Sequence, residues 1–143
     1  MSDGPSDLDA MIAVAHAHAA AEEAGDIDAT MASLDDDPLY ELLPMGVGLR
    51  GRESARQYYE HFFANCMPKV TGYRLRSEWV TDEGVGQEYQ LTLDNGSGPQ
   101  RYDIIGILVF GTNGRLSGER IYASDDLIKI MFGPLLDRTE KLG

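Results

Sequence analysis

Apolar and small residues recur at helical spacing in the first part of the chain. They share one helical face at Leu8, Met11, Ile12, Ala15 and Ala19. This spacing predicts a helix that begins near Ser6 or Asp7 and ends at Gly25. Asp26 is a typical N-cap residue, so a second, shorter helix is expected to follow, with Ile27, Met31 and Leu34 on one face.

The pattern changes after residue 34. The run DDDP at 35–38 ends the helical spacing, and the stretches PLYELLP and VGLRG predict two short strands. Residues 52–67 return to helical spacing, with one face formed by Ala55, Tyr59, Phe62 and Cys66. After Pro68 a period of two predicts four long strands, joined by turns at TDEG, DNGSG and GTNG, and DLIKIMFGPLL predicts a short amphipathic helix.

This order of elements indicates one α+β domain. We expect a strongly bent, largely antiparallel sheet with helices across its concave side. The chain shows no internal repeat and no linker, so residues 1–143 are predicted to form a single domain, with 1–6 as a flexible tail.

The composition excludes several classes of partner. The 143 residues include 24 acids and 12 bases, which give a formal net charge of -12. Such a surface repels nucleic-acid phosphates and anionic lipid headgroups, so neither is an expected partner. The single cysteine, Cys66, and an acidic start that differs from a signal peptide favour a cytoplasmic protein.

Three stretches carry a family resemblance: AHAHAAAEEAGDIDATMASLDDDPLYELLPMG, RGRESARQYYEHFF and ILVFGTNGRLSGERIY. In this order they resemble the SnoaL-like group of the nuclear transport factor 2 (NTF2) superfamily, over about Leu8 to Gly133. The resemblance implies a cone-shaped α+β barrel around an apolar pocket, often in a homodimer, that works without metal or organic cofactor. Relatives perform acid-base chemistry, such as isomerisation, dehydration or ring closure, while others only bind a ligand or a protein.

Two of the three histidines lie on the first predicted helix. Helical geometry places His16 and His18 each about 80° from the centre of the predicted buried face, on opposite sides. Both therefore cannot serve one pocket, and because metal ligands on a helix need a spacing of three or four, we predict no metal site here. The resemblance places His18 where ketosteroid isomerases keep the tyrosine that donates to an oxyanion, so His18 is a predicted catalytic residue. The alternative is a buried histidine bonded to a backbone carbonyl.

Tyr59 and Glu41 are further catalytic candidates. The resemblance matches Tyr59 to the tyrosine that supports the oxyanion donor, and its hydroxyl could bond His18; a core tyrosine bonded to backbone is the alternative. The two catalytic acids of ketosteroid isomerases fall on Leu43 and Gly106, so both are missing. Glu41 points to the same side of its strand as Leu43 and could supply a carboxylate, or it faces solvent.

Two other family patterns are also incomplete. The histidine of scytalone dehydratase falls near Val70, and its carboxylate at the end of the first helix falls near Glu23, with Glu22 beside it. We interpret that EEAGD segment as a solvated helix end. The aspartate of limonene epoxide hydrolase falls on Ile121.

The long strands supply the remaining candidates. Strand parity places Tyr89, Tyr102 and Glu119 on the presumed inner face. We expect the pocket lining to include Leu43, Phe62, Ile104, Gly106 and Ile121. Glu119 among such neighbours would be partly desolvated and a better base, although one bulge would exchange it with Arg120.

These residues predict a cofactor-independent lyase or isomerase that acts on an apolar cyclic or aromatic oxygenated small molecule. His18, supported by Tyr59, would polarise an oxygen or carry a proton, and Glu41 or Glu119 would act as base. Tyr102 or Tyr89 would bond a substrate hydroxyl. Retro-aldol cleavage, dehydration and cyclisation all fit. The alternative is a non-catalytic module of the same fold that binds a small molecule or a protein.

Overall fold

The computed structural model describes residues 7–143; the predicted flexible tail, 1–6, lies outside the described residues. The α-helices are α1 (Asp7–Ala24), α2 (Ile27–Ala32), α3 (Arg52–His61) and α4 (Asp125–Phe132). The π-helix is η1 (Phe62–Cys66), and the 3₁₀-helices are η2 (Met67–Lys69) and η3 (Gly133–Arg138). The strands are β1 (Leu34–Leu43), β2 (Val47–Arg50), β3 (Val70–Val80), β4 (Gly84–Asp94), β5 (Pro99–Phe110), β6 (Leu116–Tyr122) and β7 (Glu140–Lys141).

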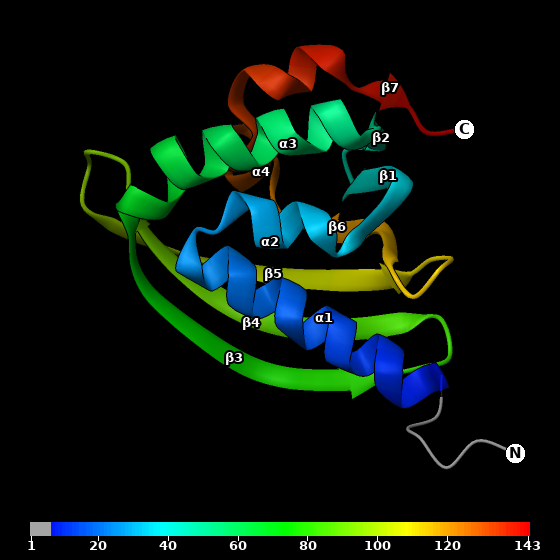
Figure 1. Ribbon diagram of the computed structural model, residues 1–143. Coiled ribbons are helices and arrows are strands. Elements are labelled where there is room, and N and C mark those ends of the chain that lie inside the picture. Colours follow the sequence, from blue (N-terminus) through cyan, green and yellow to red (C-terminus); the bar gives the residue numbers. More distant parts are fainter. Residues whose placement is uncertain (1–6) are drawn as a thin grey trace, which may run out of the picture.

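All the strands belong to one curved, unclosed sheet. Its order is β3-β4-β5-β6-β1-β2-β7, and β1 pairs with β6 in parallel while the other pairs are antiparallel. The long strands β3, β4 and β5 bend, and α1 lies across them (Figure 1). The predicted α+β class with a curved, mostly antiparallel sheet is therefore confirmed.

Local signals in the sequence explain the helix ends. The Asp26 side chain accepts a hydrogen bond from the backbone nitrogen of Ala29 at 3.0 Å and caps α2, as predicted. Gly25, with φ at +69°, follows the last residue of α1. The first strand is longer than predicted, since it begins directly after α2 and includes the DDDP run as an irregularity opposite β6.

The buried face of α1 is rotated from the predicted one: Ala15 is buried as predicted, but Met11, Ile12 and Ala19 are only half-buried. The buried residues of this helix are Ala15, His18 and Ala21, whereas Leu8 is 41% exposed. Because alanines make the helix nearly equally apolar on all sides, packing against the sheet and α2 decides its rotation. His18 is consequently at the centre of the buried face, not at its edge.

The core lies between the concave face of the sheet and the helices. Tyr58 of α3 and Phe132 of α4 stack with ring centroids 4.1 Å apart, and Tyr40 of β1 packs edge-on against Tyr59. Gly118 of β6 has φ at +136°, and a Cβ there would lie 1.9 Å from the Leu39 carbonyl oxygen, so only glycine lets β1 and β6 approach at this point. Across residues 7–143, the helices lack the length and apolar character needed to traverse a bilayer.

Candidate functional site

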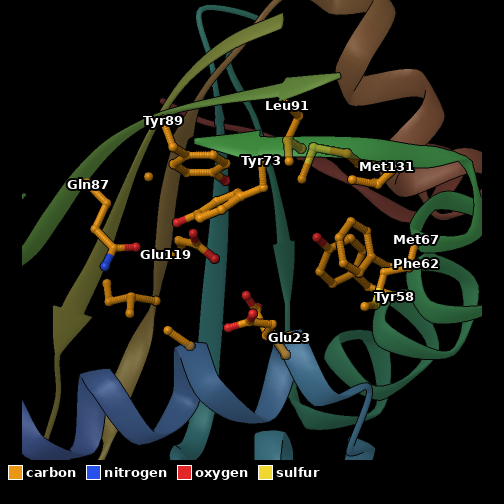
Figure 2. A pocket seen from close by; sticks show the side chains of 15 residues that line it. Glu23, Tyr58, Phe62, Met67, Tyr73, Gln87, Tyr89, Leu91, Glu119 and Met131 are labelled. Atoms are coloured by element: carbon orange, nitrogen blue, oxygen red, sulfur yellow. The ribbon is translucent and has the colours of Figure 1, made fainter. Parts of the chain in front are cut away.

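A cavity of about 400 Å³ lies between α1, the start of β3 and the concave face of the long strands. Its apolar side chains are Ala19, Phe62, Met67, Val70, Leu91, Leu108 and Met131. Its polar ones are Glu22, Glu23, Tyr58, Tyr73, Gln87, Tyr89 and Glu119. Figure 2 shows that Glu119 reaches in from the sheet and Glu23 from α1, on opposite sides of the space.

Glu119 is held in this cavity by the strand beside it. Gly106 lies on β5, and a Cβ there would be 2.8 Å from Oε1 of Glu119, so the absence of a side chain makes room for the carboxyl. Within residues 7–143 no hydrogen-bonding or ion-pairing side chain is found for Glu119. Burial raises the pKa of Glu119 well above its ordinary value, and the negative charge of Glu22 raises it further.

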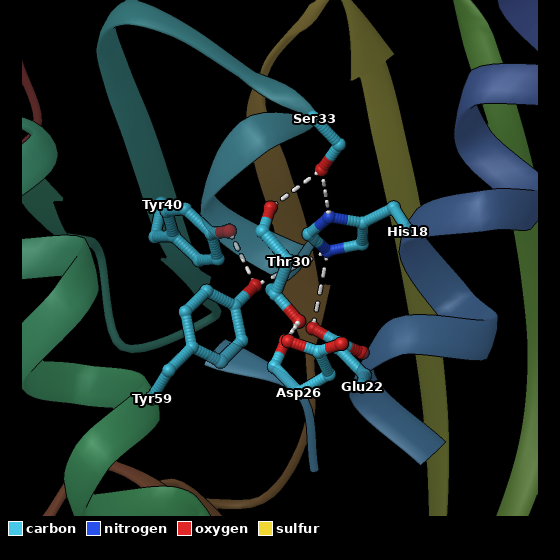
Figure 3. Close-up of polar contacts among 7 residues, drawn as sticks. All are labelled: His18, Glu22, Asp26, Thr30, Ser33, Tyr40 and Tyr59. Atoms are coloured by element: carbon cyan, nitrogen blue, oxygen red, sulfur yellow. Dashed lines mark hydrogen bonds and ion pairs between the residues drawn. The ribbon is translucent and has the colours of Figure 1, made fainter. Parts of the chain in front are cut away.

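His18 is fully buried, and Figure 3 shows its ring next to Glu22 on α1. Its Nδ1 is 2.6 Å from Oγ of Ser33, and that hydroxyl donates its own proton to the carbonyl oxygen of Thr30 at 2.6 Å. The Ser33 oxygen must therefore accept from His18, which places a proton on Nδ1. In the neutral ring, Nε2 is consequently the nitrogen with the free lone pair.

Nε2 of His18 faces two partners. It is 3.2 Å from Oε1 of Glu22, four residues further along α1, and 3.2 Å from the hydroxyl of Tyr59. The Tyr59 hydroxyl in turn bonds the hydroxyl of Tyr40 at 2.5 Å. Burial and then the Glu22 charge raise the pKa of Tyr59 well above the ordinary value, so this phenol stays protonated and can donate.

The facing atoms of His18, Glu22 and Glu119 all lie within 4.8 Å of one another. One imidazole nitrogen and two carboxylate oxygens form a donor set that divalent transition metals accept. In the structure Nε2 instead accepts a hydrogen bond from the Tyr59 hydroxyl and lies 3.2 Å from Oε1 of Glu22. The same cluster can share protons, because two close carboxyls in an apolar cavity do not both ionise readily.

The structure brings several predicted residues together. The predicted contact between Tyr59 and His18 is present, and Glu119, Tyr89, Gly106 and Phe62 line the cavity. His16, predicted to be a bystander, is exposed and bonds Glu78 at 3.0 Å.

Glu41 and Leu43 do not reach the cavity, contrary to prediction. Tyr40 and Leu42 are the buried residues at this end of β1, so the intervening Glu41 and Leu43 point to the other face of the sheet. There, Oε2 of Glu41 is 3.1 Å from Nε of Arg120, in an ion pair.

Three further predicted cavity residues also lie elsewhere. Tyr102 is near the start of β5, and its hydroxyl donates a hydrogen bond to the side chain of Gln100 at 3.1 Å. Ile104 and Ile121 are on the inner face but are buried in the core beyond the cavity, each 1% exposed. Strand alternation correctly predicted the face of the sheet for all three residues. Alternation does not show where along a strand the cavity begins.

The place of Glu22 in the cavity was not predicted from the sequence, where this residue was interpreted as part of a solvated helix end. Glu22 is half-buried, lines the cavity and contacts His18. The spacing of four residues between His18 and Glu22 was the available signal, since it places both side chains on one helical face. Tyr40, Ser33 and Tyr73 were also missed.

Comparison with known proteins identifies the fold. Neither a family model nor a curated protein matches the chain. Among solved structures, an NTF2-like protein of unknown function from Burkholderia xenovorans is 24% identical, with a TM-score of 0.62 over 82% of this chain and 84% of that one. Bal32a, from a soil-derived mobile gene cassette, is 15% identical, with a TM-score of 0.70 over 89% and 98%. An LEH-like epoxide hydrolase of Mycobacterium tuberculosis is 21% identical, with a TM-score of 0.64 over 91% and 92%.

These identities define a shared fold and not a shared activity. The SnoaL-like group stays a prediction. The chain has the curved sheet and the helix arrangement of the NTF2-like proteins, and its fold is the NTF2-like fold.

Proposed function

We propose that the protein is an acid-base enzyme, a lyase or isomerase, that acts on an apolar cyclic or aromatic oxygenated molecule in the cavity. One observation carries this proposal: Glu119 and Glu22 meet in a largely apolar cavity, with His18 bonded to Glu22 from behind. Pairs of carboxyls whose environments differ are suited to the roles of acid and base.

Glu119 serves as the general acid. Its raised pKa keeps the proton on the carboxyl at pH values where an exposed glutamate has lost it. From the sequence, Glu119 is a predicted base; its desolvation next to Glu22 favours the role of acid instead. The protonated carboxyl can donate to a carbonyl or hydroxyl oxygen of the substrate, where negative charge develops during the reaction.

Glu22 serves as the general base, with His18 as its proton store. Glu22 takes a proton from the substrate and can pass it to Nε2 of His18, 3.2 Å away. The proton on Nδ1 is held by Ser33, so the ring accepts at Nε2 and becomes an imidazolium paired with Glu22. Tyr59 and Ser33 are positioning residues, because they fix the tautomer and orientation of His18 and do not contact the cavity.

The proposed reactions each use this equipment. In isomerisation, Glu22 removes a proton from the carbon beside a carbonyl while Glu119 protonates the oxygen, giving an enol. In dehydration, the same proton leaves the carbon while Glu119 protonates a hydroxyl that departs as water. In retro-aldol cleavage, Glu22 takes the proton of a hydroxyl, a carbon–carbon bond breaks, and the enolate fragment is protonated by Glu119. That a solved NTF2-like neighbour is described as an epoxide hydrolase supports acid-base chemistry on this fold.

The experiment is deuterium exchange into a cyclic ketone. 2-Tetralone is incubated with the protein in deuterated buffer, and loss of its α-proton signals is followed by NMR. Glu22→Gln keeps the size of the side chain but removes the base, and we expect the catalysed rate to fall about 10²–10³-fold. Glu41→Gln, on the other face of the sheet, is the matched control and should keep the rate. Exchange that persists in Glu22→Gln would overturn the assignment of the base, and no catalysed exchange of any ketone that binds would favour the non-catalytic module.

A further inference from the structure

The cavity presents negative charge and aromatic rings without a cation. Three carboxyls line it, Glu22, Glu23 and Glu119, together with the rings of Tyr58, Phe62, Tyr73 and Tyr89. No lysine or arginine is among its described lining residues. A ligand that carries a carboxylate or a phosphate would meet only like charge here.

This negative charge acts on the whole cavity. Burial raises the pKa of the Tyr58 and Tyr89 phenols most, and the negative charges of Glu22 and Glu119 raise it next. After burial, the charge of Glu23 contributes most to the raised pKa of Tyr73. With the Glu119 proton in place, Glu22 and Glu23 still put negative charge beside a cavity whose walls are largely apolar. Glu22 contacts the His18 ring at 3.2 Å and Glu23 is exposed, and both carboxyls can face a positive group that enters the cavity.

The rings lie where such a positive group would be bound. Tyr73 and Tyr89 pack with ring centroids 5.6 Å apart, and Figure 2 shows both rings next to Glu119. The same figure shows Tyr58, Phe62, Met67 and Met131 at the other end of the cavity. Glu119 therefore lies at the end of the cavity that holds the rings of Tyr73 and Tyr89, and ammonium groups are attracted to the faces of aromatic rings.

We infer that the ligand of this cavity is an organic amine: a protonated amino group bound between the α1 carboxylates and the rings of Tyr73 and Tyr89, on an apolar ring body that contacts Phe62, Leu91 and Met131. The inference rests on the proposed function in placing the substrate in this cavity, and it names the substrate's chemical class. The net charge of -12 adds a long-range attraction for cations.

The test compares three probes that share an indole ring and differ in charge: tryptamine (ammonium), tryptophol (neutral) and indole-3-acetate (carboxylate). Their dissociation constants are measured by isothermal titration calorimetry at neutral pH. Tryptamine should bind at least about tenfold more tightly than tryptophol, the fold-change that about 1.4 kcal/mol of ion-pair and cation–π attraction gives. Indole-3-acetate should not bind detectably.

Two variants locate the preference. Glu22→Gln removes a charge without changing the side chain's size, and it should weaken tryptamine about tenfold while leaving tryptophol unchanged. Glu41→Gln, whose carboxylate pairs with Arg120 outside the cavity, should change neither. If Glu22→Gln fails to fold, the comparison of the three probes on the unmodified protein still decides the question.

Equal binding of tryptophol and tryptamine, or no binding of tryptamine, overturns the inference. The inference is also overturned if tryptamine does not bind while Zn²⁺ alone binds tightly and loses this binding in Glu22→Gln. The positive group that these carboxyls bind would then be a metal ion. These failures are separable from that of the proposed function. If tryptamine binds preferentially but deuterium exchange persists in Glu22→Gln, only the proposed function fails. If exchange depends on Glu22 but tryptamine binds no better than tryptophol, only the inference about the amine fails.

Discussion

Removal of the Tyr59 hydroxyl tests the hydrogen-bond chain behind Glu22. Tyr59 is fully buried, and its hydroxyl connects the Tyr40 hydroxyl to Nε2 of His18. In Tyr59→Phe, the Tyr40 hydroxyl loses its partner, and the part of the chain that the structure describes offers it no other. Leaving a buried hydroxyl unsatisfied costs about 1–3 kcal/mol, so we expect the free energy of unfolding to fall by about 2 kcal/mol.

The double variant makes this prediction specific. Tyr40→Phe leaves the Tyr59 hydroxyl bonded to His18, so it should cost less, about 1 kcal/mol. When both hydroxyls are removed, no phenol is left unpaired, and the double variant should lose about 2 kcal/mol rather than the sum of about 3. His18 keeps Glu22 and Ser33 as partners in every variant.

Urea denaturation followed by circular dichroism gives the four free energies, provided that the m-value is unchanged. Tyr122→Phe is the control, since Tyr122 is 43% exposed and its hydroxyl should matter by less than about 0.5 kcal/mol. Additive losses in the double variant would refute the reasoning, because the two hydroxyls would then not depend on each other.

Three further predictions concern the cavity and the outer face of the sheet. Gly106→Ala places a Cβ 2.8 Å from Oε1 of Glu119. Because the flexible carboxyl can move, the free energy of unfolding should change by less than about 1 kcal/mol, whereas the rate of ketone deuterium exchange should fall about tenfold or more. Gly72→Ala is the control. Glu119→Gln should flatten the pH dependence of stability. Because folding raises its pKa, Glu119 contributes fully to the stability of the native state below its ordinary pKa near 4.5 and loses this contribution as pH rises through the raised pKa. In urea titrations the variant should therefore gain stability relative to the unmodified protein as pH rises above about 4.5; a parallel pair of profiles would contradict this. We also propose a homodimer through the outer face of the sheet, where Ile105 is 37% exposed, and Ile105→Glu should yield a monomer in size-exclusion chromatography with light scattering; an unchanged mass would place the interface elsewhere.

The fold could be predicted because its signals are local. Alternation along the long strands, the turn residues between them and the Asp26 cap each determine nearby structure without knowledge of the rest of the chain. Where that local signal is weak, the prediction failed. On α1, alanines lie on all sides of the helix, so the sequence does not define its buried face. In β1, Tyr40, Leu42 and Leu43 place apolar residues on both faces, so strand alternation does not show which face Glu41 lies on.

The site could be predicted only in part for a different reason. His18, Tyr59 and Glu119 stand out by residue type and by the resemblance, but the role of Glu22 depends on what it faces. Only packing shows that Glu119, from the far end of the chain, lies opposite Glu22 and that both lie beside apolar side chains. A carboxyl at a helix end is ordinarily solvated, and it is the sheet that makes this one different.

The parallel pairing of β1 with β6 has a consequence for how the protein folds. β1 comes early in the sequence, but it pairs with β6, which is formed by residues 116–122. The middle of the sheet is therefore built from segments that are distant in sequence. Such non-local pairing slows folding, because the loop between the segments must be closed before the contacts stabilise it. The same pairing positions Glu119 of β6 next to Glu22 of α1, so the two carboxyls of the proposed site meet only when segments distant in sequence are in contact.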